Sequence, residues 1–335
     1  MTLDLNGRTL LVTGGTGSFG TAFTTRLLKE FPDVTLRIFS RDELKQSEMA
    51  NRFDHDPRLR FFVGDIRSRE RLSRATKGVD FIIHAAAMKQ VPACEYNPFE
   101  AIQTNVLGSQ HIVDAAIDNG VKTVVALSTD KAVNPVNLYG ATKLCEEKLI
   151  VQGNAYASGT GAKLCCVRYG NVVGSRGSVL PLFRRLVAEG ARTLPITDAR
   201  MTRFWITLQQ GVDFVLSGFA RMQGGELFVP KLPSARTVDL AVAVAPELPH
   251  EIIGIRPGEK LHEVMCPRDD SRLTLEFADH FVIRPCISFN RPVDYRANPL
   301  GETGTEVADG FKYDSGSNPH VLDVPQLRRL IAEVA

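Results

Sequence analysis

Short apolar runs alternate with helical patterns along the first half of the chain, and this alternation limits the fold more than any other feature. The runs predict six buried strands, at residues 9–12, 34–39, 59–63, 79–83, 121–127 and 163–167. Strands that alternate with helices form a parallel sheet with helices on both faces. The sequence therefore predicts an α/β fold with a Rossmann-type, doubly wound parallel sheet, on which ligands bind at the carboxyl ends of the strands.

A glycine-rich turn joins the first predicted strand to a helix at residues 21–29. It has the sequence T-G-G-T-G-S-F-G, with Gly14, Gly17 and Gly20 at intervals of three. Glycine allows positive φ in the turn and a close approach to a pyrophosphate, which the N–H groups at the helix start can bind. The spacing departs from the usual G-x-G-x-x-G, but its place between a strand and a helix predicts a dinucleotide site.

The end of the second strand is where such folds distinguish NAD from NADP. An acidic residue there binds the 2′-hydroxyl of NAD, whereas an arginine accommodates the 2′-phosphate of NADP. This chain has Ser40, Arg41 and Asp42, with Lys45 close behind. Arg41 and Lys45 can pair with a phosphate dianion, so we expect NADP. The alternative is that both cations are solvated at a helix start and that Asp42 serves NAD.

Further polar residues follow the third and fourth strands. Asp65 could face the adenine amino group or could cap the next helix. Lys89 could reach the nicotinamide or a sugar diphosphate, or it could be an ordinary surface lysine. Asn105 lies in a long helix over residues 98–119 and needs buried partners, which a structural hydrogen bond or a relay water would supply. We expect His84 to pack in the core.

The stretch from residue 127 to residue 148 carries the most chemistry, beginning L-S-T-D-K-A-V-N-P-V-N-L-Y-G-A-T-K. Thr129, Asp130 and Lys131 end the fifth strand. Tyr139 and Lys143 are four residues apart, so they share one face of a helix. We expect the Lys143 ammonium to lie beside the Tyr139 ring and to lower its pKa, which would make the phenol a usable base. A lone Y-x-x-x-K pair also arises by chance, but here it follows a strand end.

Beyond residue 174 the alternation loosens into helices at 179–189, 207–222 and 237–245, a strand or turn at 194–198, a strand at 226–229 and a final helix from 324. Arg176, Arg203 and Arg256 lie in this half. Their forked donors suit a diphosphate, although surface ion pairs would explain them as well. We expect an NADP-binding domain at 1–174 and 206–229, and a smaller α+β nucleotide-sugar-binding domain at 175–205 and 230–335.

Composition and charge exclude several other classes. The net charge is +2 without a basic block, which gives no indication of nucleic acid or of an anionic membrane. No apolar run has the length of a membrane span and no leader-like segment opens the chain, so we expect a cytoplasmic protein. The six cysteines are scattered, which favours free thiols in a reducing compartment. No metal-binding spacing of Cys and His is present.

Several long motifs resemble a known group of enzymes. They include S-R-D-E-L-K-Q-S-E-M, A-A-A-M-K-Q-V-P, V-R-Y-G-N-V-V-G-S-R-G-S-V, P-I-T-D-A-R-M-T-R-F-W-I-T and G-I-R-P-G-E-K-L-H-E-V-M. With T-G-x-x-G-x-x-G and Y-x-x-x-K, the chain resembles the extended short-chain dehydrogenases/reductases that act on nucleotide sugars. More narrowly, it resembles the inverting UDP-N-acetylglucosamine 4,6-dehydratases of pseudaminic acid biosynthesis, over nearly its whole length.

This resemblance implies a hydro-lyase that converts UDP-N-acetylglucosamine to UDP-2-acetamido-2,6-dideoxy-β-L-arabino-hexos-4-ulose. It also implies tightly held NADP, recycled in each turnover, and a homo-oligomer between dimer and hexamer. A UDP-sugar epimerase of the same family and a non-catalytic NADP-binding regulator are the alternatives. An epimerase needs no acid for a leaving hydroxyl, and a regulator of this kind usually lacks the Tyr or the Lys.

The resemblance also assigns roles to individual positions. Asp130 would protonate the leaving C6 hydroxyl and Lys131 would remove the C5 proton, for which its pKa should be lowered by burial or by Lys143 or Lys89. The catalytic set is Thr129, Asp130, Lys131, Tyr139 and Lys143. The cofactor set is Gly14, Gly17, Ser18, Phe19, Gly20, Ser40, Arg41, Asp42, Glu43, Lys45, Gln46, Asp65, Ile66, Ala85, Ala86, Lys89, Leu127, Ser128, Tyr139, Lys143 and Val172. The substrate set is Lys89, Lys131, Asn171, Arg176, Pro195, Thr197, Arg203, Arg256 and Glu259.

Overall fold

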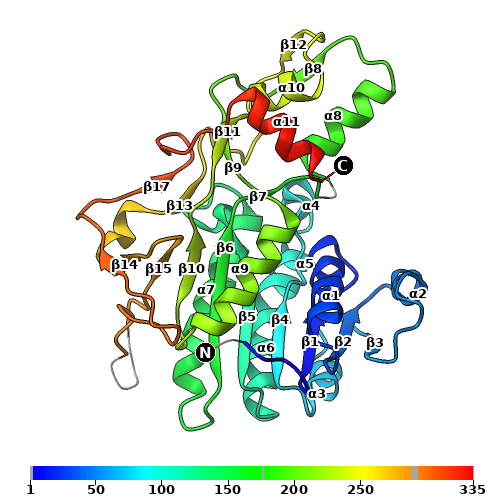
Figure 1. Cartoon of the computed structure of the whole chain (residues 1–335), viewed down its shortest axis with the longest axis vertical. Helices are drawn as coiled ribbons and strands as arrows, with labels where there is room; N and C mark the ends of the chain where they lie inside the picture. Colours follow the sequence, from blue (N-terminus) through cyan, green and yellow to red (C-terminus); the bar gives the residue numbers. More distant parts are fainter. Residues whose placement is uncertain (1–2, 176, 288–292, 335) are drawn as a thin grey trace.

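The computed structural model describes residues 3–175, 177–287 and 293–334. In these ranges ten strands form one large sheet, in the order β16-β14-β15-β10-β6-β5-β4-β1-β2-β3 (Figure 1). Its parallel part contains β1 (Thr9–Thr13), β2 (Thr35–Ser40), β3 (Leu59–Val63), β4 (Phe81–His84), β5 (Thr123–Thr129), β6 (Lys163–Tyr169) and β10 (Leu227–Pro230). The predicted doubly wound parallel sheet is therefore confirmed.

Helices cover both faces of this sheet (Figure 1). On one face α1 (Ser18–Glu30) packs beside α9 (Leu208–Arg221), and on the other α3 (Arg69–Thr76), α6 (Gly108–Asp118) and α7 (Leu138–Tyr156) pack in a row. The helix α2 (Glu43–Arg52) contacts β2 and β3. Central strands are buried from both sides, which is why β5 and β6 consist almost entirely of buried residues.

The long helix expected over residues 98–119 has an irregular first half. It consists of α5 (Pro98–Ile102), a π-helical turn (Gln103–Leu107) and α6, and the short α4 (Val91–Tyr96) precedes it. The turn places Asn105 in the interior, where its amide donates to Met88 O (2.9 Å) and to Thr142 Oγ1 (2.9 Å) and accepts from Met88 N (2.8 Å). A π-helical turn often marks a functional region, and here it fixes the loop after β4.

Antiparallel strands extend the sheet beyond β10. They are β15 (His280–Ile283), β14 (Thr274–Glu276) and β16 (Thr305–Glu306). The expected sugar-binding domain at 230–335 includes these three strands, which belong to the main sheet. The side chains of Phe277, Phe281 and Tyr313 pack in the same core as the Rossmann strands.

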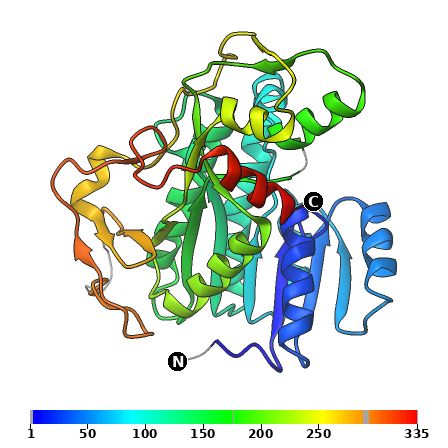
Figure 2. The same cartoon turned by 45° about the horizontal axis from the view of Figure 1, so that its top comes forward.

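A second buried cluster has Trp205 and Phe183 at its centre and draws on three separate stretches, around residues 173–205, 235–245 and 322–327. Its helices are α8 (Val179–Ala188), α10 (Thr237–Val244) and α11 (Val324–Ala332). Its strands are β7 (Asn171–Val172), β9 (Thr202–Ile206) and β11 (Ser234–Arg236) in one sheet, and β8 (Leu194–Ile196) with β12 (His250–Ile252) in another. The elements around this second cluster form a module that lies above the main sheet, and α11 lies at the front of the module (Figures 1 and 2).

A short antiparallel pair, β13 (Val264–Cys266) with β17 (Tyr313–Asp314), joins the two parts. A 3₁₀ turn (Arg268–Leu273) follows β13. All six cysteines are free, four of them buried and two, Cys145 and Cys286, exposed. Of the helices in the described ranges, none combines the length and apolarity that a membrane crossing would need.

Candidate active site

The predicted site motifs meet at one edge of the sheet. Each lies at or just after the carboxyl end of a parallel strand: the glycine-rich turn after β1, residues 40–46 after β2, residues 65–66 after β3, residues 85–89 after β4, and residues 127–131 at the end of β5. Asn171 follows β6 and begins β7. Because parallel strands end at the same edge, residues more than 100 positions apart in the chain line one rim.

The glycine-rich turn is shaped by close backbone approach. Gly14 has φ +64°, and a Cβ there would lie 2.9 Å from Ala85 O, so a larger residue would push β1 and the β4 loop apart. A Cβ on Gly20 would lie 2.4 Å from Gly15 O. Gly17 is the N-cap of α1 with φ −74°. Of these three glycines, Gly14 uses the positive φ, whereas Gly17 and Gly20 leave space for the neighbouring backbone.

At the end of β2 the carboxylate of Asp42 is already engaged by groups of the α2 helix. Asp42 caps α2 by accepting from Lys45 N (3.0 Å) and also pairs with Lys45 Nζ (2.9 Å). Gln46 is buried and donates to Ser40 Oγ (3.0 Å). Arg41 is largely exposed, with Asp65 Oδ2 at 3.8 Å. The edge therefore offers a hydroxyl and a guanidinium to a ligand, while Asp42 is committed to its helix.

The loops after β3 and β4 complete the cofactor side. Asp65 accepts from Arg67 Nε (2.9 Å), and Ser68, not Asp65, caps α3. His84 is buried, as expected, with Nδ1 2.8 Å from Thr13 Oγ1; burial lowers its pKa to about 3. The Thr13 hydroxyl also accepts from the backbone N–H groups of Ala85 and Ala86. The β1 and β4 ends are thus fixed to each other beside the glycine-rich turn.

Together these residues fit a dinucleotide. The turn leaves no space for side chains at Gly14 and Gly20, where a Cβ would overlap neighbouring backbone. The α1 helix starts at Ser18 with no side-chain cap hydrogen bond at Gly17. The first N–H groups of a helix need an acceptor, and phosphate oxygens supply one. Ser18, Phe19 and Ile66 lie at this edge, where a pyrophosphate and an adenosine would bind.

A 3₁₀ turn (Asp130–Ala132) places two charged residues at the end of β5. Asp130 is fully buried, and its Oδ1 accepts from Thr129 Oγ1 (3.0 Å) and Lys131 Nζ (3.1 Å). Its Oδ2 is buried and has no hydrogen-bond partner among the residues that the structure describes. Burial raises the pKa of Asp130, and the Lys131 ammonium opposes this only in part. In its protonated form, which the raised pKa favours, a carboxyl at this place can donate to a ligand.

The pKa of Lys131 does not follow the expectation from the sequence. Burial lowers it, but the carboxylates of Asp130 and Glu263 outweigh burial, so the pKa is raised and not lowered. The expected effect of a neighbouring lysine is found instead at Lys89, whose pKa is lowered by burial and by the charge of Lys131. In this structure Lys131 is a cation, and it lies 3.4 Å from Asn171 Oδ1.

The Tyr139–Lys143 pair also differs from the expectation. Both residues lie in the first turns of α7, but the Lys143 ammonium donates to Leu127 O (2.6 Å) and to the carboxylate of Glu146. Burial raises the pKa of Tyr139 above its ordinary value, and the charge of Glu146 raises it further, whereas a hydrogen bond with Thr129 opposes the shift. The expected lowering of the phenol pKa is therefore wrong here, because burial and the charge of Glu146 both raise it.

Next to Lys143, a second buried ion pair joins α7 to β6, and a hydrogen bond from Ser128 joins α7 to β5. Glu147 accepts from Arg168 Nε (2.9 Å) and Nη2 (2.6 Å) and from Ser128 Oγ (2.5 Å). Ser128, predicted as a cofactor residue, thus faces α7 through its side chain. Bidentate Arg–carboxylate pairs fix geometry well, so this pair holds the catalytic end of β5 in place.

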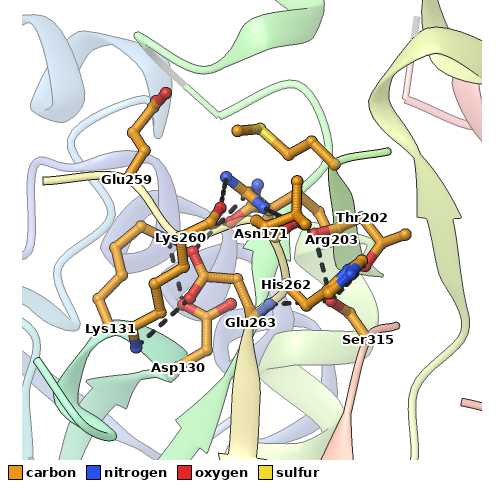
Figure 3. A network of polar contacts seen from close by, with 12 residues as sticks. Asp130, Lys131, Asn171, Thr202, Arg203, Glu259, Lys260, His262, Glu263 and Ser315 are labelled. Atoms are coloured by element: carbon orange, nitrogen blue, oxygen red, sulfur yellow. Dashed lines mark hydrogen bonds and ion pairs between the residues drawn. The ribbon is translucent and has the colours of Figure 1, made fainter. Parts of the chain in front are cut away.

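A charged cluster from the C-terminal half faces the Asp130–Lys131 turn (Figure 3). Glu263 is buried and lies 3.5 Å from Lys131 Nζ, 3.7 Å from Arg203 Nε and 3.7 Å from Lys260 Nζ. Glu263 and Lys260 were not among the predicted site residues. Both stand in the motif G-I-R-P-G-E-K-L-H-E-V-M, close to the predicted substrate residues Arg256 and Glu259. That position in the sequence could have identified them as site residues.

The expected substrate residues have different surroundings. Arg203 is buried and donates to the carbonyl groups of Thr202 (2.7 Å), Lys260 (3.0 Å) and Leu261 (3.2 Å). Its donors therefore fasten residues 260–261 to β9. Arg256 is exposed and pairs with Glu259 (3.0 Å).

The remaining predicted positions lie in or next to β7 and β8, or outside the described ranges. Pro195 is part of β8, and the Thr197 hydroxyl donates to Met201 Sδ (3.1 Å). Val172 is in β7, beside Asn171. Arg176 lies outside the described residues. The loop before Glu259 is held to the start of α7 by Asn137 Nδ2, which donates to Gly258 O (2.7 Å).

Comparison with known proteins gives relatives over most of the chain. An inverting UDP-N-acetylglucosamine 4,6-dehydratase of Campylobacter jejuni is 57% identical over 327 residues, 97% of this chain and 98% of that protein. A UDP-glucose 4-epimerase of Rickettsia akari is 44% identical over 271 residues, 78% of this chain and 79% of that protein.

Solved structures agree in fold. The X-ray structure of Pen from Bacillus thuringiensis has a TM-score of 0.89 and 35% identity, and the match covers 99% of both chains. DesIV from Streptomyces venezuelae, a dTDP-glucose 4,6-dehydratase with NAD and TYD bound, has a TM-score of 0.67 and 27% identity over 76% of this chain and 86% of that chain. Residues 10–285 match the model of the polysaccharide biosynthesis protein family. The chain thus belongs to the polysaccharide biosynthesis protein family.

Proposed function

We propose that the protein is an inverting UDP-N-acetylglucosamine 4,6-dehydratase that works with NADP. The observation that carries this proposal is the Asp130–Lys131 pair, a buried acid beside an amine at the carboxyl end of β5. Elimination of water needs an acid for the leaving hydroxyl and a base for the carbon-bound proton, and these two residue types supply both. The relative of that activity, 57% identical over 97% of this chain, supports the same function.

Each proton transfer of the reaction is assigned to a different side chain of the site. A bound nicotinamide cofactor would supply the oxidation at C4 and the return of hydride at C6. Tyr139 would accept the proton of the C4 hydroxyl as the phenolate, a form that its raised pKa opposes in this structure, and the Thr129 hydroxyl orients the phenol. Lys131 removes the C5 proton, which the C4 ketone makes acidic; because its pKa is raised in this structure, Lys131 must first lose a proton to act as the free amine. Asp130 gives its proton to the C6 hydroxyl, which leaves as water, and reprotonation of C5 on the opposite face inverts that centre.

The β2 edge supports NADP rather than NAD. The acidic candidate for the NAD ribose, Asp42, already caps α2 and pairs with Lys45. Arg41 is largely exposed beside Ser40, where a 2′-phosphate would bind. The DesIV structure, which has NAD bound, has a similar fold at 27% identity. The fold therefore does not distinguish NADP from NAD, and the proposal of NADP depends on the side chains of Ser40, Arg41 and Asp42.

The sugar nucleotide would lie between the sheet edge and the second module. Its diphosphate would bind Arg256, whose exposed guanidinium also pairs with Glu259, together with Lys89 and Arg176. Asn171 would contact the sugar beside Lys131, and Pro195 and Thr197 would line the uridine side. We propose Arg203 as an indirect contributor, since its donors hold the 260–261 backbone. The cytoplasmic location and the homo-oligomer stay predictions.

A UDP-sugar 4-epimerase is the second candidate, since a relative 44% identical has that name. One experiment separates the two activities. Purified protein is incubated with UDP-N-acetylglucosamine, and the product is examined by mass spectrometry and NMR. The proposed reaction loses the mass of one water and gives the L-configured C5, whereas an epimerase gives a product of unchanged mass. Unchanged mass with inverted C4 would refute the dehydratase.

A further inference from the structure

Asn137 joins two segments of the site that lie far apart in the sequence. Its Oδ1 accepts from Gly140 N (2.7 Å), which makes it the N-cap of α7, and its Nδ2 donates to Gly258 O (2.7 Å), 121 positions further along the chain. An N–H group only donates and a carbonyl only accepts, so these two partners fix the orientation of the amide. One side chain therefore holds both the start of the helix that carries Tyr139 and the turn that follows Arg256.

The turn around Gly258 is closed on itself and packs against the Rossmann part of the molecule. Glu259 N donates to Arg256 O (3.1 Å), and Gly258 between them has φ +80°. A Cβ on Gly258 would lie 3.0 Å from Asn137 Cβ and 3.3 Å from Val91 Cγ1, so the turn lies directly against the starts of α7 and α4. The carbonyl that Asn137 binds therefore belongs to the same tight turn as Arg256.

A second contact fastens the neighbouring segment at its other end. The Lys260 ammonium donates to Val133 O, directly after the 3₁₀ turn at the end of β5. The Lys260 backbone is in turn held by Arg203, which donates to Lys260 O (3.0 Å). The segment from Val133 to Asn137, which connects the 3₁₀ turn to Tyr139, is thus bound at both ends by one loop from the C-terminal half of the chain.

We propose that Asn137 is a positioning residue, through which binding of the substrate diphosphate at Arg256 sets the place of the Tyr139 phenol. This role rests on the proposed dehydratase function, which supplies both the diphosphate at Arg256 and the task of Tyr139. Contacts to the nucleotide are made away from the reacting carbon, and they raise the rate only where they order the reacting groups. The amide of Asn137 is a direct link between these two parts of the site.

The test uses substitutions that separate the two hydrogen bonds of Asn137. Asn137→Asp keeps an oxygen for Gly140 N, since aspartate is as good an N-cap as asparagine, but it has no donor for Gly258 O. Asn137→Ser also keeps a capping oxygen and loses the donor, and it adds no charge. Asn97→Asp is the matched control, because it makes the same exchange at an exposed side chain whose amide donates to Ala93 O (3.0 Å) in α4.

Two measurements on the NADP-loaded protein distinguish positioning from binding. Single turnovers with UDP-N-acetylglucosamine, followed by mass spectrometry, give the rate of water loss, and calorimetry gives the affinity for UDP. We expect both Asn137 variants to bind UDP within about twofold of wild type and to lose water about 10-fold to 100-fold more slowly, as for a slightly misplaced reacting group. Asn97→Asp should match wild type in both measurements.

A double-variant cycle shows whether Asn137 acts on behalf of Arg256. Arg256→Ala should itself weaken UDP binding and slow the loss of water. Because the proposed coupling begins at Arg256, adding Asn137→Asp to Arg256→Ala should slow the reaction by less than about twofold further. A merely structural role at the start of α7 would instead multiply the two losses.

Three results would overturn the proposal while the dehydratase function stands. They are a wild-type rate in Asn137→Asp, two losses that multiply in the double variant, and an unchanged UDP affinity in Arg256→Ala. A loss of UDP affinity in Asn137→Asp as large as its loss of rate would also overturn it, because Asn137 would then only hold the nucleotide loop.

Asn137→Ser replaces Asn137→Asp in every comparison if the aspartate variant does not fold. Wild type is measured first, and this separates failure of the coupling from failure of the proposed function. If wild type releases no water from UDP-N-acetylglucosamine, the proposed function fails and the coupling fails with it, before any variant is compared.

Discussion

At the scale of single residues, the site is controlled by which charges are buried together. Asp130, Lys131 and Glu263 come from two distant parts of the chain and set one another's protonation. Burial and the charge of Glu146, which pairs with Lys143, raise the pKa of Tyr139. In both cases a lysine expected to act through its own charge is paired with a carboxylate. Ionisable groups that perturb one another in this way are characteristic of functional sites.

The acid role of Asp130 leads to a first prediction. Asp130→Asn keeps the size of the side chain but cannot deliver a proton, so the release of water should fall by about 10² to 10⁴-fold. Binding of UDP-N-acetylglucosamine, measured by calorimetry, should change little. In wild type the rate should fall as pH rises through the raised pKa of Asp130, because the acid must be protonated. Full turnover by Asp130→Asn would contradict the assignment.

A second prediction concerns the cofactor. Arg41→Ala removes the exposed guanidinium beside Ser40, and a charged hydrogen bond of this kind contributes about 1.5–3 kcal/mol. We expect NADP binding to weaken about 10-fold to 100-fold, with NAD binding much less affected. Fluorescence titration with both cofactors measures this, and Arg52→Ala at the other end of α2 is the matched control. Equal losses for NADP and NAD would show that Arg41 does not contact the 2′-phosphate.

At the scale of elements, loops and turns carry the site while strands and helices hold them. The 3₁₀ turn at the end of β5 aims Asp130 inward, and the π-helical turn before α6 buries Asn105 against the β4 loop. The strand ends could be predicted from the sequence because apolar runs and glycine positions mark them. The π-helical turn could not, since nothing in the local pattern distinguishes it from a regular helix.

The turn between α9 and β10 gives a prediction about stability. Glu226 is buried, and it accepts from the backbone N–H groups of Gln223 and Gly224. Burial raises its pKa from 4.5 to about 7. The folded protein therefore holds a proton that the unfolded chain releases between these pH values. The stability that this proton contributes is complete below pH 4.5 and is lost as pH rises to about 7.

Glu226→Gln has no proton to lose and should remove this dependence. The difference of 2.5 pH units corresponds to about 3 kcal/mol in the free energy of unfolding. Urea unfolding of both proteins at about pH 5 and about pH 8 measures it: wild type should lose stability relative to the variant at the higher pH. The exposed Glu276 is a control position. Parallel curves for the two proteins would show that Glu226 ionises normally.

At the scale of the whole molecule, two buried clusters share one chain that crosses between them several times. The second cluster takes residues from three stretches, and β9 leaves it to enter α9 on the main sheet. A cluster assembled in this way has no continuous chain of its own, so it should not fold without the main sheet. The proposed site lies where the two meet, which is also where Glu263 reaches Lys131 (Figure 3).

Cooperative unfolding is the prediction at this scale. Trp205 is the one tryptophan of the sequence and is buried in the second cluster, so its fluorescence reports on that cluster alone. We expect the fluorescence and far-UV circular dichroism transitions in urea to coincide. A fluorescence transition at lower urea would instead indicate that the second cluster unfolds independently.

Sequence alone determined the parallel sheet, the dinucleotide edge and the Asp130–Lys131 and Tyr139–Lys143 motifs, because each depends on short-range patterns of apolar residues, glycines and helical spacing. Only the tertiary structure decided the charge states. Glu263 stands 132 positions after Lys131 in the numbering, and no local pattern predicts that their side chains meet. Burial and ion pairing act through space, so the pKa of Lys131, the pairing of Lys143 with Glu146, and the antiparallel extension of the sheet all depend on contacts that the linear order does not contain.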